Sequence, residues 1–146
     1  EGGFNSFQLF LLREMSGENL LLYDKTSVFM DIHSSSNSSS DLNSEFVAEA
    51  KYIYRTYVKD ESEFQVNLSS DHVLRWIQSG IEHSEELDKA KLLDIIEEAH
   101  RECYILMLDP YSRYLLSSLY QQFMNTSGGI ETALSTDGDT RLSKVL

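Results

Sequence analysis

Apolar residues recur mostly at spacings of three and four along this chain, and only one proline, Pro110, interrupts the pattern. Such spacing places side chains on one face of an α-helix, whereas a half-buried strand needs strict alternation. The period is clear near the start of the chain, at Phe4, Phe7, Phe10 and Leu11. The chain is therefore predicted to be all-α.

The same period predicts six helices, and two local signals are expected to set their ends. Ser16 is a good N-cap for the second helix because its hydroxyl can accept from the amide of Glu18 or Asn19. Asp109-Pro110 is expected to start a new helix, since aspartate caps and proline suits the first helical position. The helices are expected at 4–14, 16–29, 44–57, 71–81, 85–108 and 109–123.

The length of 146 residues suits one domain with a single core. Residues 34–44 read SSSNSSSDLNS, a polar tract that predicts a flexible surface loop inside the domain. Residues after Asn125 are polar and rich in glycine, with little helical period. We therefore expect a domain over 1–126 and a polar tail over 127–146.

The net charge is −12, from 12 basic and 24 acidic residues. Such a chain repels phosphate backbones and anionic lipids, so neither nucleic acid nor direct membrane insertion is expected. A protein partner with a basic patch would complement this negative charge better than nucleic acid or an anionic membrane would. The single cysteine, Cys103, allows no internal disulfide and lies in an apolar-periodic segment, which predicts a buried side chain in a cytoplasmic protein.

No pattern typical of catalysis or of a cofactor is present in the sequence. The four histidines lie far apart, without the spacing of metal ligands, so no metal site is expected. Neither a nucleophile motif nor a phosphate-binding loop is found. We therefore expect no enzyme active site in the chain itself. The histidines are His33, His72, His83 and His100.

Five segments of the chain resemble, in order, the motifs of the regulator of G-protein signalling (RGS) domain. The first, GFNSFQLFLLREMSGEN at 3–19, is similar to that family's opening motif. The others are AKYIY at 50–54, VNLSS at 66–70, AHRECYILM at 99–107 and DPYSRYL at 109–115. The match covers about 3–125 and implies the family's nine-helix bundle, here without its first two short helices.

The resemblance implies a GTPase activator that is not itself an enzyme. Members of the family bind the GTP-bound α subunit of heterotrimeric G proteins (Gα), steady its switch regions and need no cofactor. The implied protein is monomeric and cytoplasmic, with membrane recruitment left to parts of a longer protein. By position, the residues implied to contact Gα are Glu14, Glu18, Asn19, Asn67, Leu106, Asp109 and Arg113.

Several of these residues have a structural alternative. Asn67 fits an Asx turn, and Asp109 fits a helix cap whose second oxygen stays free. Glu14 and Glu18 fit a solvated acidic corner. One residue is missing between Met107 and Asp109 relative to the family motif, so Ile105 competes with Leu106 for the contact. A second function is also open: an RGS-like module that binds or scaffolds without activating hydrolysis.

Overall fold

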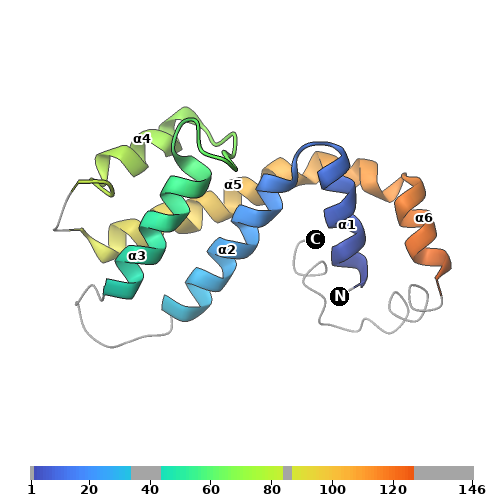
Figure 1. Cartoon of the computed structure of the whole chain (residues 1–146), viewed down its shortest axis with the longest axis horizontal. Helices are drawn as coiled ribbons and strands as arrows, with labels where there is room; N and C mark the ends of the chain where they lie inside the picture. Colours follow the sequence, from blue (N-terminus) through green and yellow to red (C-terminus); the bar gives the residue numbers. More distant parts are fainter. Residues whose placement is uncertain (1, 34–43, 84–86, 127–146) are drawn as a thin grey trace. The chain divides into compact units, whose positions relative to one another are not determined.

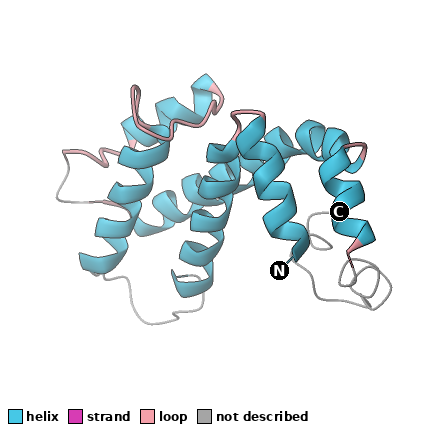
Figure 2. Cartoon of the chain, turned by 45° about the vertical axis from the view of Figure 1, so that its right-hand side comes forward, coloured by secondary structure: helices cyan, strands magenta, loops and turns pink. Residues whose placement is uncertain are grey.

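The computed structural model of the chain describes residues 2–33, 44–83 and 87–126. Within them every regular element is helical, so the all-α prediction is confirmed (Figure 2). The predicted tail at 127–146 and most of the Ser-rich loop, 34–43, lie outside the described residues. The elements are α1 (Gly2–Arg13), α2 (Gly17–His33), α3 (Ser44–Ile53), the π-helical turn η1 (Tyr54–Val58), α4 (Ser70–Gln78), α5 (Lys89–Leu115) and α6 (Ser118–Asn125).

The chain divides into two compact units, and α5 contributes residues to both. The central unit runs from Glu18 to Ile105, and the terminal unit combines Glu1–Gly17 with the chain from Leu106 onward. Figure 1 colours these segments along the sequence. Each unit is held by its own set of aromatic contacts.

Ring contacts between neighbouring helices build the core of the central unit. Phe29 of α2 packs on Phe46 of α3 with ring centroids 5.1 Å apart, and these two helices lie side by side in Figure 1. Tyr54 stacks on Trp76 of α4 at 5.8 Å. Trp76 is fully buried. Burial of such large apolar side chains is the main force that folds the unit.

A buried polar contact ties α2 to α5 inside this core. The Thr26 hydroxyl donates to the Leu22 carbonyl at 2.8 Å. The same hydroxyl oxygen lies 3.0 Å from Nδ1 of His100, which is hydrogen-bonding distance. His100 also stacks on Tyr23 at 4.1 Å. This contact therefore links α2 to α5 through polar groups inside the core.

The last turn of the third predicted helix is wider than an α-turn. Residues Tyr54–Val58 form the π-turn η1, and the amide of Lys59 donates to the Tyr54 carbonyl at 2.8 Å. This turn buries Tyr54, Tyr57 and Val58 together. The period predicted the helical extent correctly, but it did not distinguish the π-turn.

Cys103 is buried in the central unit, as the sequence predicts. Burial raises the pKa of its thiol to about 12. A thiol that stays protonated is a poor nucleophile, so Cys103 contributes packing rather than chemistry.

Aromatic side chains also hold the terminal unit together. Phe7 of α1 contacts Tyr111 and Tyr114 of α5 with centroids 5.3 and 5.2 Å apart, and Tyr114 contacts Tyr120 of α6 at 5.4 Å. The Ser6 hydroxyl donates to the Leu119 carbonyl at 3.5 Å. These contacts fix α1 against the end of α5, which matters for the charged residues described below.

The predicted helix restart at Asp109-Pro110 is wrong. The helix α5 continues through Pro110 to Leu115, and the real break follows at Ser117, whose hydroxyl accepts from the Tyr120 amide at 3.2 Å and caps α6. Proline removes only one helical hydrogen bond, to the Leu106 carbonyl. Buried residues on both sides of it, Met107 and Tyr114, keep the helix packed.

The buried side chain of His72 on α4 should make the stability of the domain depend on pH. Its ring is buried, and its Nε2 accepts from the indole N–H of Trp76 at 2.9 Å. Burial holds the pKa of His72 below its usual 6.5, against the opposing pull of Glu102 and Glu98. The unfolded chain therefore takes up a proton near pH 6.5 while the folded chain does not, so stability should fall as the pH falls through that range. Burial also lowers the pKa of His100, so this residue should contribute to the same pH dependence.

We expect the free energy of unfolding in urea to decrease from pH 7.5 to pH 5.5, and His72→Gln to reduce that slope. His83→Gln is the matched control, because the His83 side chain is 91% exposed. An identical slope for wild type and His72→Gln would contradict this account.

Candidate functional site

A carboxylate–guanidinium cluster forms in the terminal unit from Glu14, Asp109 and Arg113. Arg113 Nε donates to Glu14 Oε1 at 3.2 Å, and Arg113 Nη2 donates to Glu14 Oε2 at 2.5 Å. Its Nη1 donates to the Asp109 carboxylate one turn earlier on α5. The paired fork fixes the direction of the Glu14 side chain as well as binding it. These three predicted site residues are therefore held together.

The charged groups of this cluster shift the pKa values of Glu14 and Arg113. The hydrogen bond from Arg113 is the main reason that the pKa of Glu14 is lowered below 4.5. The hydrogen bonds that Arg113 donates to Glu14 and then to Asp109 raise the pKa of Arg113. Glu14 and Arg113 are thus both ionised at neutral pH. The Asp109 side chain remains 81% exposed, so its carboxylate is accessible to a further donor.

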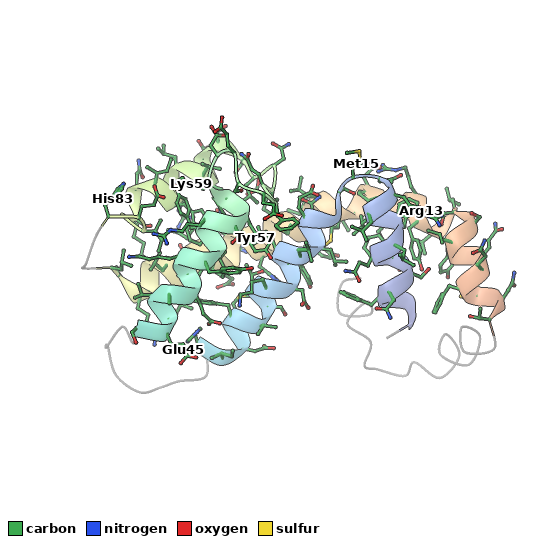
Figure 3. All side chains as sticks on the ribbon, viewed as in Figure 1. Arg13, Met15, Glu45, Tyr57, Lys59 and His83 are labelled. Carbon is green, nitrogen blue, oxygen red and sulfur yellow. The ribbon has the colours of Figure 1, made fainter. Side chains whose placement is uncertain are left out.

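The backbone after α1 explains how Glu14 reaches Arg113. Met15 has φ 55°, the left-handed conformation, and it is exposed at the turn in Figure 3. The Ser16 amide donates to Leu11 O at 3.0 Å and the Met15 amide to Leu12 O at 3.3 Å. This is the Schellman pattern of a helix C-terminus, with Met15 where glycine is usual. Glu14 is therefore the C-cap of α1.

Gly17 allows the turn to stay close to α1. A Cβ atom at this position would lie 3.0 Å from Cδ2 of Leu12. Any larger residue would push Leu12 aside. The glycine thus leaves room for the Leu12 side chain beside the turn.

Glu18 and Asn19 lie in the first turn of α2, in the central unit. The helix begins directly after Ser16, as predicted, but the Ser16 hydroxyl donates to the Leu11 carbonyl at 3.5 Å. Glu18 is half-exposed, and its charge is favourable at a helix N-terminus. Asn19 is only 9% exposed. Of this pair, Glu18 is the more accessible residue.

Leu106 and Ile105 differ in their exposure. Leu106 is half-buried, three residues before Asp109 on α5. Ile105 is 63% exposed. Asp109 itself lies inside α5, so the alternative in which it caps a new helix is wrong. The Asp109 side chain instead forms an ion pair with Arg113.

Asn67 lies at the apex of a tight turn in the central unit. The Leu68 amide donates to the Val66 carbonyl at 2.8 Å, which makes an inverse γ-turn centred on Asn67. Val66 and Leu68 are buried, with 2% and 7% exposure, whereas Asn67 is exposed. The Val66 amide also donates to Tyr57 O at 2.8 Å. Two buried neighbours thus hold the turn and point the asparagine outward.

A contact that the sequence did not reveal lies directly after this turn. Glu102 of α5 accepts from the Ser69 amide at 2.5 Å and from the Ser69 hydroxyl at 3.3 Å. The two residues are 33 positions apart, and Glu102 carries no motif that marks it. The Glu14–Arg113 pair was also missed, because only Asp109 was expected to pair with Arg113.

The described residues include neither a metal-binding group of side chains nor a helix that could span a membrane. Within residues 2–33, 44–83 and 87–126, no group of three or more His, Cys, Asp or Glu side chains could hold a metal ion. In the same part of the chain, none of the helices combines the length and the apolar character needed to span a bilayer.

Comparison with known families gives the class of the protein. The family model described as "Regulator of G protein signaling domain" matches residues 1–123. A search of curated proteins returned no match. The chain therefore belongs to the RGS family, a family that regulates G-protein signalling, and the resemblance noted in the sequence is confirmed.

Proposed function

We propose that this domain binds the GTP-bound Gα subunit and accelerates its GTP hydrolysis. The observation that carries the proposal is the exposed amide of Asn67 on a turn that is fixed by buried residues on both sides. An asparagine amide can donate and accept hydrogen bonds without bringing net charge near a γ-phosphate. It is therefore suited to steady a water-orienting glutamine of the partner.

The cluster of Glu14, Asp109 and Arg113 supports the same function. Arg113 holds Asp109 in place while leaving its carboxylate exposed. A carboxylate of this kind suits the amide and hydroxyl donors of a switch segment. Glu18, Asn19 and Leu106 complete the proposed contact set. Phosphoryl transfer depends mainly on positioning and fixed charges, which such a surface can supply without covalent chemistry.

The domain performs no reaction itself in this proposal. Nucleotide, magnesium ion and catalytic glutamine belong to the partner, and the domain acts as a monomer in the cytoplasm. A ligand accelerates a step only by favouring the reactive state over the resting state. The domain should therefore bind Gα most tightly in its transition-state form.

Single-turnover GTP hydrolysis on a panel of Gα subunits tests this function. We expect at least one subunit to hydrolyse GTP about 10²- to 10³-fold faster with the domain, equivalent to ~3 to ~4 kcal/mol of transition-state stabilisation. Binding should be stronger to Gα with GDP and aluminium fluoride than to Gα with GDP alone. Tight binding to both forms without faster hydrolysis would support the scaffold function instead.

A further inference from the structure

The start of α4 depends on a side chain from another helix. The N-cap residue of α4 is Ser69, and its side chain makes no cap hydrogen bond. Instead, the Glu102 carboxylate accepts from both the amide and the hydroxyl of Ser69. Backbone amides at a helix start have no partner within the helix, so an external acceptor stabilises them. Glu102 fills that role here.

This contact lies two residues after Asn67. On the upstream side, the turn is held by the bond from the Val66 amide to Tyr57. On the downstream side, the chain between Leu68 and α4 is tied to α5 through Ser69 and Glu102. The exposed asparagine therefore lies between two anchors. Only the downstream anchor is a side chain that can be removed by substitution.

The Glu102 carboxylate also lies near the buried ring of His72, beyond hydrogen-bonding distance. Because Nε2 of His72 accepts from Trp76, the neutral ring carries its proton on Nδ1. That Nδ1 lies 3.9 Å from Glu102 Oε2 and 3.4 Å from Glu98 Oε2. Glu102 itself is only 22% exposed, and the next residue along α5 is the buried Cys103. Its position is therefore restricted by its partial burial and by its two hydrogen bonds with Ser69.

We propose that Glu102 is a positioning residue for Asn67. The inference rests on the proposed function, because it assigns to Glu102 an effect on hydrolysis that passes through the Asn67 turn. With Glu102 in place, the turn is ordered before the partner arrives, so less conformational freedom is lost in the activated complex. Without it, Ser69 and the turn gain freedom and Asn67 meets its target less often.

The test compares Glu102→Ala and Glu102→Gln with the control Glu97→Ala, an exposed glutamate on the same helix. Glu102→Ala should reduce the acceleration of hydrolysis about tenfold. Glu102→Gln keeps an acceptor oxygen for the Ser69 amide and should stay within about threefold of wild type. Glu97→Ala should behave as wild type. Melting temperatures confirm that each variant is folded.

A double-mutant cycle with Asn67→Ala separates positioning from a general structural role. If Glu102 acts through Asn67, adding Glu102→Ala to Asn67→Ala should cost less than about twofold more. A full tenfold further loss in that background would overturn the proposal. So would a Glu102→Ala variant that is as active as wild type.

Backbone ¹⁵N order parameters at 67–69 provide a readout that does not depend on GTP hydrolysis. They should fall in Glu102→Ala and recover in Glu102→Gln, whether or not the wild-type domain activates a given Gα. Lack of acceleration by wild type across the panel would contradict the proposed function alone. Unchanged order parameters in Glu102→Ala would overturn the role of Glu102 alone.

Discussion

Asn67→Ala is expected to reduce the acceleration of GTP hydrolysis by roughly 10- to 100-fold, or ~1.4 to ~2.7 kcal/mol. The alanine loses both the donor and the acceptor that the exposed amide offers at the turn apex. Asn67→Asp should lose more, because its carboxylate brings a negative charge toward the nucleotide. Single-turnover hydrolysis measures both effects.

The stability of these variants should hardly change. Asn67 is exposed, and its φ is not positive, so alanine fits its backbone conformation. The expected change in unfolding free energy is within about 0.5 kcal/mol. Gln78→Glu is the matched control for charge, since it adds one negative charge at the other end of α4. An Asn67→Ala domain that accelerates hydrolysis as wild type does would remove this residue from the proposed site.

Trp76→Ala should have the largest effect on stability. Trp76 is fully buried, stacks on Tyr54 and donates its indole N–H to His72. Its truncation leaves a cavity and an unpaired buried acceptor, so we expect a loss of about 3 to 5 kcal/mol of unfolding free energy. Trp76→Phe keeps most of the ring packing and should cost less, chiefly through the lost hydrogen bond.

Urea unfolding followed by far-ultraviolet circular dichroism measures this effect. Intrinsic tryptophan fluorescence is unsuitable because Trp76 is the only tryptophan in the chain. Ile77→Ala is the control on the same helix, with a side chain that is 57% exposed, and should cost about 0.5 kcal/mol or less. Equal losses for Trp76→Ala and Ile77→Ala would contradict the assignment of Trp76 to the core.

The helices were predictable from sequence because the apolar period and burial agree over most of the chain. The stripe at Phe7 and Leu11 faces the core of the terminal unit, as its spacing implies. The error at Pro110 has a clear physical cause. The Asp109-Pro110 pair is typical of a helix start. The burial of Met107 and Tyr114 on either side of the proline nevertheless keeps α5 continuous.

The candidate site was predictable only in part. Family motifs pointed to Asp109 and Arg113, and their four-residue spacing predicts the ion pair that the structure contains. By contrast, the bond from Arg113 to Glu14 spans 99 residues and depends on the left-handed turn at Met15. Contacts of this kind come from tertiary packing, which a single sequence does not encode in any local spacing. The same holds for Glu102.

The proline inside α5 also affects what that helix offers to its surroundings. Because proline has no amide hydrogen, the carbonyl oxygen of Leu106 lacks the helical donor that other interior carbonyls have. A main-chain carbonyl oxygen without a helical donor can accept a hydrogen bond from water or from a bound molecule. The stretch that carries Asp109 thus combines a side-chain acceptor with a backbone acceptor, and the latter is independent of which side chain occupies position 106.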